Sequence, residues 1–322
     1  MQLPPWARRM DQLASEGVPF LFILDFDLTR PLVIPLKDID ENSGGIQFQI
    51  NKSKSDPAVN IIETRFSKFP VSFEVYKSGF EQVLNALHAG DTYLLNLCYS
   101  TKMEGLPTLK EIFDVVQAPY KLYVPDKFVV FSPEQFVSIS DGVIRTFPMK
   151  GTIDASIPNA EATLLADIKE KEEHATVVDL LRNDISIVAN KVTVNRYRYI
   201  TEIKTSDKYL LQCSSEISGM VDDSFAGKPG SMMHALLPAG SVTGAPKKRT
   251  VELIHEIELE PRGYYTGVFG VFDGKDLDSA VMIRMIEQRA DGYYYRSGGG
   301  ITYRSVAGQE YQEMIDKVYI PK

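Results

Sequence analysis

Two pairs of glutamates have a spacing that can bring carboxylates together. Glu170 and Glu173 are three residues apart, and so are Glu310 and Glu313. Residues three apart on a helix share a face, so each pair projects two carboxylates in one direction. If the two helices meet, four like charges converge, and such an all-oxygen ligand set suits Mg²⁺. Taken alone, however, the Glu-x-x-Glu spacing is more often part of a solvated helix face.

A lysine and a further glutamate could act directly on a substrate. Lys150 ends an apolar strand just before a glycine, and a lysine that is partly removed from water can lose its proton and act as a nucleophile. Glu134 lies between apolar strands and could serve as a general acid if it is buried. Because most lysines and glutamates are solvated, each residue alone is a weak indication of chemistry.

Two glycine-rich segments could bind an anion. Residues 240–249 lack the spacing of a Walker phosphate loop but place Thr243 near the cap and Pro246 in the first turn of an expected helix. Free backbone N–H groups and the helix dipole could meet an anion there. Residues 296–302 contain three consecutive glycines and predict a loop whose amides can approach a ligand. An ordinary capped helix and a plain flexible turn explain the two segments equally well.

Composition limits the classes of partner. The 322 residues carry a formal net charge of −8, which disfavours sequence-independent binding of nucleic acid or of an anionic membrane. Any anionic ligand must therefore be held by a local cluster of donors. Cys98 and Cys213 are expected to be small buried residues of a reducing compartment. The apolar stretch from Phe20 ends at Asp25, far short of a membrane span, and with no targeting segment in the sequence we expect a cytoplasmic protein.

The elements that must position these residues are mostly strands joined as hairpins. Strands are expected at 20–24, 32–34, 46–50, 93–99, several places within 121–152, 191–220, 265–272, 280–287 and 293–296. Helices are expected at 74–89, from Asn159 as one helix past Leu181, from about 231, after 246 and from about 309. The polar stretch 38–60 predicts a variable loop. Such an order favours an α+β fold with antiparallel sheets over a doubly wound nucleotide fold.

From about Phe80 to Lys317 the sequence closely resembles the chorismate-utilising enzymes, which include anthranilate synthase component I, aminodeoxychorismate synthase component I, isochorismate synthase and salicylate synthase. The similar stretches stand in the family's order. They are Ala89-Gly-Asp-Thr-Tyr-Leu-Leu-Asn-Leu97, Ser132-Pro-Glu134, Pro148-Met-Lys-Gly-Thr152, Lys169-Glu-Lys-Glu-Glu-His-Ala-Thr-Val-Val-Asp-Leu-Leu-Arg-Asn-Asp184, Gly240-Ser-Val-Thr-Gly-Ala-Pro-Lys247, Asp278-Ser-Ala-Val-Met-Ile-Arg284, Ser297-Gly-Gly-Gly300 and Gln309-Glu-Tyr-Gln-Glu-Met-Ile-Asp-Lys317.

The resemblance implies large antiparallel β-sheets packed as a sandwich with helices on the outside. Because its catalytic pieces are scattered from Glu134 to Lys317, we expect one chorismate-binding catalytic domain over 1–322. Residues 1–75 would be a shortened N-terminal part of that domain. This part leaves little room for the feedback tryptophan pocket of larger relatives, so no tryptophan site is expected.

The resemblance also implies roles for individual residues. Glu173 and Glu313 would bind Mg²⁺ directly, while Glu170 and Glu310 would hold metal-bound waters. Glu134 corresponds to the general acid that protonates the departing 4-hydroxyl of chorismate. The substrate's carboxylates would be held by Arg284, Tyr265 and Lys317 and by the amides of Gly298, Gly299, Gly300, Thr243 and Gly244.

Within the family, Lys150 discriminates between activities. Enzymes similar to aminodeoxychorismate synthase carry a lysine there that adds to C2 of chorismate, whereas anthranilate synthases carry alanine. The expected product is therefore 4-amino-4-deoxychorismate, a precursor of 4-aminobenzoate and folate. Because the chain has no glutaminase signature, ammonia would come from a glutamine amidotransferase subunit or from free ammonium. Anthranilate synthase component I, or a chorismate-binding subunit that is inactive alone, are the alternatives.

Two positions depart from the family's pattern. Leu94 stands where many relatives have glutamine and where water-adding isochorismate synthases have a lysine base, so direct hydration at C2 is disfavoured. Gln212 stands where many relatives have a histidine beside the substrate.

Overall fold

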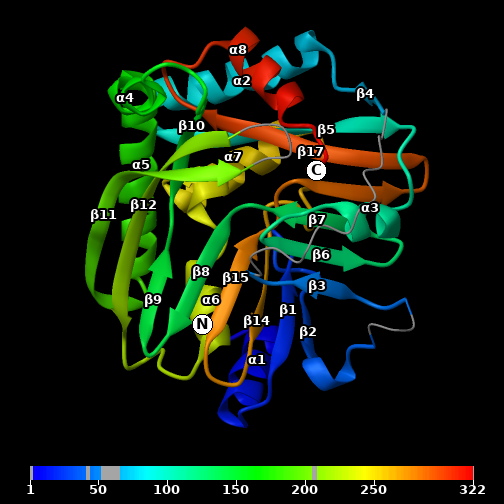
Figure 1. Cartoon of the computed structure of the whole chain (residues 1–322), viewed down its shortest axis with the longest axis vertical. Helices are drawn as coiled ribbons and strands as arrows, with labels where there is room; N and C mark the ends of the chain where they lie inside the picture. Colours follow the sequence, from blue (N-terminus) through cyan, green and yellow to red (C-terminus); the bar gives the residue numbers. More distant parts are fainter. Residues whose placement is uncertain (1–2, 41–43, 52–65, 205–208, 322) are drawn as a thin grey trace.

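A computed structural model describes residues 3–40, 44–51, 66–204 and 209–321 of the chain. Two large antiparallel sheets dominate the structure, and helices cover their outer faces (Figure 1). The predicted α+β fold of packed antiparallel sheets is confirmed.

The first sheet has nine strands in the order β10-β12-β9-β8-β15-β14-β1-β2, with β11 paired to β12 outside this path. Its strands are β1 (Phe20–Leu24), β2 (Leu32–Pro35), β8 (Gln135–Ser140), β9 (Val143–Thr146), β10 (Met149–Asp154), β11 (Ala189–Lys204), β12 (Tyr209–Val221), β14 (Val268–Phe272) and β15 (Leu277–Val281). The hairpin of residues 20–35 expected from the sequence is present as β1 and β2.

The second sheet has eight strands in the order β13-β5-β17-β16-β7-β6-β3, with β4 paired to β5. Its strands are β3 (Gln47–Gln49), β4 (Ser67–Phe69), β5 (Leu94–Glu104), β6 (Tyr120–Val124), β7 (Phe128–Ser132), β13 (Gly244–Ala245), β16 (Met285–Arg289) and β17 (Gly292–Ile301).

The alternation of side chains along β1 explains how the layers pack. Leu21 and Ile23 join a core with residues of the second sheet, while Phe20, Phe22 and Leu24 face the opposite way. There they pack with side chains of α1 (Pro5–Ser15) and α6 (Pro229–Leu236). All five residues of β1 are fully buried, so this strand is covered on both faces.

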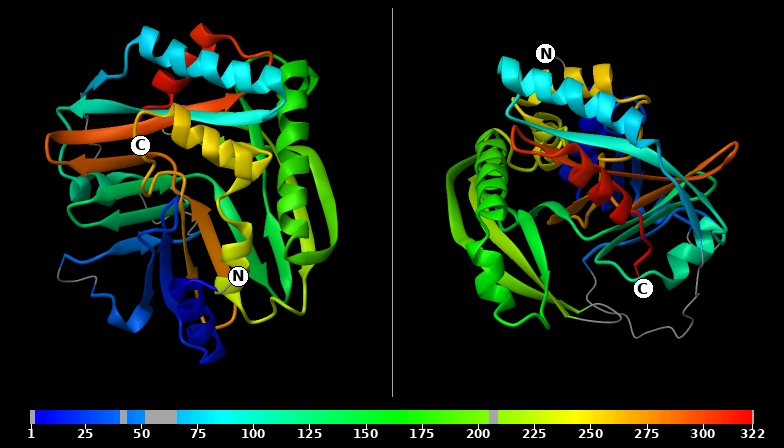
Figure 2. Two further views of the ribbon diagram at one scale, coloured as in Figure 1. Left: turned by 180° about the vertical axis from the view of Figure 1, so that it is seen from behind. Right: turned by 90° about the horizontal axis from the view of Figure 1, so that it is seen from above.

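The remaining helices cover the second sheet and one end of the first. Side chains of α2 (Phe73–Ala89), α7 (Lys247–Ile257) and α8 (Ala307–Asp316) form a core with β5 and β17, and α2 and α8 lie over these strands in Figure 1. The short helix α3 (Leu109–Val115) packs near β6 and β7. Helix α5 (Ile168–Ser186) packs on β11 and β12, as the view from above in Figure 2 shows.

The single helix expected from Asn159 onward is wrong. The structure has α4 (Ala160–Ala166) and then α5, which are separated at Asp167. The side chain of Asp167 accepts the backbone N–H of Glu170 at 3.0 Å, so this residue begins a new helix as its N-cap. Asn159 has a positive φ of 58° and makes no capping bond, and Ile168 is 69% exposed.

Two expectations about strands are also wrong. Residues 280–287 form the end of β15 and the start of β16, which belong to different sheets, and Arg284 turns the chain between them with φ 53°. Residues Gly298, Gly299 and Gly300 do not form a loop but continue β17, where they pair with Cys98, Leu97 and Asn96. Glycine is needed there because the strands approach closely: a Cβ on Gly298 would lie 2.0 Å from the carbonyl oxygen of Leu97.

Other expectations concern the loop, the cysteines and membranes. The predicted strand within the 38–60 loop is present as β3, whereas residues 41–43 and 52–60 of that loop lie outside the described residues. Cys98 and Cys213 are both buried and unbridged. None of the described helices combines the length and the apolar composition that crossing a membrane requires.

Replacement of Gly298 by alanine tests the close approach of β17 and β5. Because the new Cβ would overlap the Leu97 carbonyl, we expect G298A to lower the free energy of unfolding by about 1–3 kcal/mol, the range for overpacking. The matched control is G308A in α8, where a Cβ meets nothing within 4 Å and should stabilise the helix by about 0.5–1 kcal/mol. Urea unfolding of both variants gives the comparison, and equal stability of G298A and wild type would contradict the expectation.

Candidate active site

One edge of β17 is left open beyond Arg296. Strand β16 pairs with β17 only as far as Met285 and Arg296, whereas β5 continues to pair with it as far as Ile301. In the part of the chain that the structure describes, residues 297–301 of β17 therefore have a strand partner on one side only. Backbone groups on the other side are available to a ligand or to side chains.

The alternation of backbone groups decides which glycine amides face this open edge. The N–H groups of Asn96 and Cys98 point away from β17, to the carbonyl of Thr243 and the carboxylate of Glu258. Leu97, between them, therefore faces β17 and pairs with Gly299, which leaves the amides of Gly298 and Gly300 directed to the open edge. Of the three glycine amides of β17 expected to bind substrate, those of Gly298 and Gly300 are directed to the open edge and that of Gly299 belongs to the sheet.

Two lysine–glutamate pairs lie at the site. Lys150 Nζ, on β10, is 3.5 Å from Glu173 Oε2 on α5. Lys317 Nζ, at the end of α8, is 2.6 Å from Glu313 Oε1 and also donates to the carbonyl oxygen of Gly298 at 2.9 Å. Glu173 and Glu313, the two expected direct metal ligands, therefore each contact a lysine. Glu173 contacts Lys150, the expected catalytic residue, and Glu313 contacts Lys317, which was expected to bind substrate.

The other two glutamates lie close to glycines beside these pairs. A Cβ on Gly299 would lie 3.5 Å from Glu313 Oε1 and 3.6 Å from Glu310 Oε2, so both carboxylates of α8 gather over this glycine. Glu310 is only 5% exposed. A Cβ on Gly151, next to Lys150, would lie 3.0 Å from Glu170 Oε2. Each Glu-x-x-Glu pair therefore shares a helix face, as the spacing predicted.

The four glutamates of the two Glu-x-x-Glu pairs are the candidate ligands for a magnesium ion. Among the residues with described positions, no group of three His, Cys, Asp or Glu side chains forms a ready-made cation site. The chemistry of the donors nevertheless fits Mg²⁺, because all four are carboxylates and Glu310 is buried, where a carboxylate needs a compensating positive charge. Magnesium binding by these glutamates stays a prediction.

A pocket lies between α5, β5, β10, β17 and the short 3₁₀ turn η2 (Gly240–Val242). It brings together Lys150 and Glu173 with Thr243, Gly244 and Gly300. It is completed by Leu94, Asn96, Thr176, Val177, Ser241 and Thr302.

Thr243 does not cap α7 as expected. Its hydroxyl donates to the carbonyl of Ala239 at 2.7 Å, inside the η2 turn, and α7 begins after Pro246 without a side-chain cap. Gly244, next to Thr243, is paired with β5 through β13. Leu94, which departs from the family's pattern, contributes an apolar side chain to the pocket and lies close to Gly300, so it offers no base there. Gln212 lies on β12, paired with Thr152 of β10.

Glu134 is placed to hold a proton. Its Oε1 accepts a hydrogen bond from Ser241 Oγ at 2.7 Å. Removal from water raises the pKa of the Glu134 carboxyl, and this effect outweighs the Ser241 hydrogen bond and the positive charges of Lys150, Arg284 and Lys317, which lower it. Ser241 was not among the candidates from the sequence, although it lies within the quoted glycine-rich segment.

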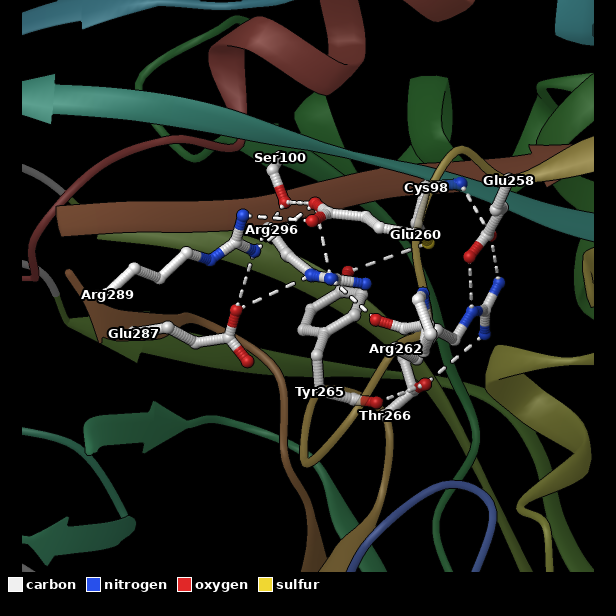
Figure 3. A network of polar contacts seen from close by, with 11 residues as sticks. Cys98, Ser100, Glu258, Glu260, Arg262, Tyr265, Thr266, Glu287, Arg289 and Arg296 are labelled. Atoms are coloured by element: carbon white, nitrogen blue, oxygen red, sulfur yellow. Dashed lines mark hydrogen bonds and ion pairs between the residues drawn. The ribbon is translucent and has the colours of Figure 1, made fainter. Parts of the chain in front are cut away.

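A network of buried charges holds Tyr265 in place (Figure 3). Arg262, 1% exposed, bonds to Glu258 and donates to the carbonyl oxygens of Val242 and Asn96 at 2.7 and 2.6 Å. It thereby ties the segment before β14 to both η2 and β5. Tyr265, three residues on, is buried, and burial raises the pKa of its hydroxyl well above the ordinary value. Arg262 was not a candidate from the sequence, because a lone arginine carries no spacing signal.

A second part of the network lies on the surface side of β5 and β17. Glu260 accepts hydrogen bonds from Ser100 and from Arg289 Nη1, the latter at 2.9 Å, and pairs with Arg296 at 3.2 Å. Arg289 also bonds to Glu287 at 2.9 Å. Glu260 belongs to the same segment as Tyr265, and its ion pairs with Arg289 and Arg296 therefore fix that segment against β16 and β17.

Comparison with known proteins places this arrangement in a family. The family model described as chorismate binding enzyme matches residues 38–321. An "uncharacterized PabA-like protein" of Haemophilus influenzae is 47% identical over 308 residues, which cover 95% of this chain and 93% of that protein. Aminodeoxychorismate synthase component 1 of Bacillus subtilis is 31% identical over 265 residues, which cover 78% of this chain but 55% of that protein. The chain belongs to the family of chorismate-binding enzymes.

A solved structure supports the same fold. Anthranilate synthase component I from Streptococcus pneumoniae superposes with a TM-score of 0.68 at 27% sequence identity, over 81% of this chain and 60% of that one. The family and fold expected from the motifs are confirmed.

Substitution of Glu134 by glutamine tests the raised pKa. The folded protein keeps this proton at pH values where the unfolded chain has lost it, so the buried carboxyl makes the wild type less stable as pH rises above about 4.5. Glutamine cannot ionise, so the stability of E134Q relative to wild type should increase with pH and then level off above the raised pKa. Urea unfolding from pH 4.5 to 8 measures this difference. E81Q, on the exposed face of α2, is the control, and a pH-independent difference for E134Q would contradict the assignment.

Proposed function

We propose that the chain is an aminodeoxychorismate synthase component I, which converts chorismate and ammonia to 4-amino-4-deoxychorismate. The observation that carries the proposal is the position of Lys150, whose Nζ lies in the pocket 3.5 Å from Glu173. Supporting it, Glu134 has a raised pKa and is subject to the charge of Lys150. The Bacillus subtilis relative bears this name, although the chain spans little more than half of that protein.

In the proposed first step, Lys150 replaces the hydroxyl group of the substrate. The neutral amine forms a bond from Nζ to C2 of chorismate, the ring double bonds shift, and the bond from C4 to oxygen breaks. Glu134 delivers its proton to the departing oxygen, so that water leaves. The hydrogen bond between Ser241 Oγ and Oε1 fixes the orientation of the carboxyl group. The excess proton on Nζ is lost, which leaves a neutral secondary amine on C2.

In the second step, ammonia forms a bond to C4, the double bonds shift back, and the bond between Nζ and C2 breaks. Proton transfer returns Lys150 to its starting state and leaves a 4-amino group on the ring. Ammonia is supplied by a glutamine amidotransferase partner or by free ammonium. Leu94 disfavours addition of water at C2, because it provides an apolar wall where a base would be needed.

The substrate's carboxylates are held by this chain's own donors. Lys317 and the amides of Gly298 and Gly300 face the open edge of β17, and Arg284 and Tyr265 receive the enolpyruvyl carboxylate. Mg²⁺ bound by Glu173 and Glu313 would neutralise the ring carboxylate and polarise the ring for loss of the hydroxyl.

The product formed from chorismate, Mg²⁺ and ammonium tests the proposal. After treatment with a lyase and chromatography, wild type should yield 4-aminobenzoate. K150A should lose this product or form it far more slowly, while its chorismate affinity by calorimetry stays within about twofold, because the lysine acts in the chemical step. K171A, on the exposed side of α5, is the control. Anthranilate as the product would support anthranilate synthase, and chorismate binding without any product would support an inactive binding subunit.

Magnesium dependence tests the four glutamates. E173Q and E313Q should abolish saturable Mg²⁺ binding in calorimetry because each removes an expected direct ligand. E170Q and E310Q should weaken it by about 10- to 100-fold, as is typical when a group outside the first ligand shell is lost. The control is E172Q on the same helix, since Glu172 pairs with Arg304 at the surface. Binding curves of E173Q and E313Q that match wild type would refute the assignment.

A further inference from the structure

The residues after α8 bring a tyrosine against Arg284. Val318 is fully buried among side chains of α3, β7 and β17, and this anchors the segment. Tyr319 follows, 42% exposed. Arg284 Nε donates to its hydroxyl at 3.2 Å, and the guanidinium carbon lies 5.0 Å from the ring centroid. Tyr319 therefore makes both a hydrogen bond and a cation–π contact with this arginine.

Arg284 is also fixed through its backbone. It has a φ of 53° where the chain passes from β15 to β16, a conformation that a long side chain adopts rarely. Its carbonyl accepts the N–H of Phe131 at 3.1 Å. Tyr295 is fully buried nearby. The positive charge of Arg284 acts on its hydroxyl.

We propose that Tyr319 is a positioning residue, which holds the guanidinium of Arg284 in the orientation that binds the enolpyruvyl carboxylate. The inference rests on the proposed function, because it takes Arg284 as the residue that receives this carboxylate. The bond from Nε to Tyr319 leaves the two Nη groups for the paired hydrogen bonds that arginine forms with carboxylates.

The energetic reason is loss of side-chain freedom. An unrestrained arginine must give up many rotamers when it binds a carboxylate, which weakens binding. Arg284 has given up part of this freedom before substrate arrives, because the ring and hydroxyl of Tyr319 already restrain it. The carboxylate is bound before and during the reaction alike, so loss of Tyr319 should weaken binding with little effect on the chemical step.

Two variants of Tyr319 separate the contributions of ring and hydroxyl. In Y319A both contacts are lost, and we expect the Kd and KM for chorismate to rise about tenfold while kcat stays within about twofold. In Y319F the ring remains, so the rise should be about threefold. Y199A is the matched control, because Tyr199 makes a similar contact with Arg196 at 3.7 Å on β11, and its Kd should stay within about twofold of wild type.

Calorimetric titration with chorismate in the presence of Mg²⁺ gives Kd, and steady-state amination with ammonium gives KM and kcat. A Y319A protein that binds chorismate as tightly as wild type would overturn the inference, as would a fall in kcat that equals the rise in KM. If wild type binds chorismate but yields no aminated product, the proposed function fails, and the Kd values alone still decide the role of Tyr319. If Y319A does not fold, the Kd of Y319F decides in the same way.

Discussion

The site depends on the point at which β16 stops pairing with β17. Up to Arg296 the backbone of β17 is bonded on both sides, and beyond it the strand keeps only β5 as a partner. The backbone groups released there are directed to a space that Lys317 and the carboxylates of α8 also reach. Because an unpaired sheet edge offers regularly spaced donors and acceptors, a rigid strand can present amides to an anion without a flexible loop.

Local pairing of opposite charges resolves the conflict between an acidic chain and an anionic substrate. The chain carries a net charge of −8, yet the positive groups Lys150 and Lys317 lie beside glutamates of two different helices, α5 and α8. Glu173 holds Lys150 at the pocket, and Glu313 holds Lys317 beside Gly298.

The sequence predicted the family, the fold class and the shared helix faces of the glutamates better than the contacts around them. The Glu-x-x-Glu spacing predicted shared helix faces correctly, since i and i+3 neighbours follow from helix geometry alone. The apolar pattern after Asn159 did not reveal the helix break at Asp167, because a capping aspartate and an interior aspartate look alike within an amphipathic pattern. The glycines of β17 were expected in a loop, since their place in a strand depends on the close approach of β5, some 200 residues away in sequence. Arg262 and Tyr319 matter through tertiary contacts that no spacing reveals.

The central position of β1 has a consequence for how the protein forms. Residues 20–24 are synthesised well before residues 268–272, with which they pair. Until residues 268–272 have been made, the five apolar residues of β1 have no strand partner on that side, and their cover by the second sheet is incomplete. Such long-range pairing slows folding and exposes apolar segments to aggregation in the meantime. The yield of folded protein on expression should therefore be more sensitive to temperature and to chaperone supply than that of a protein of similar length built mainly from local helical contacts.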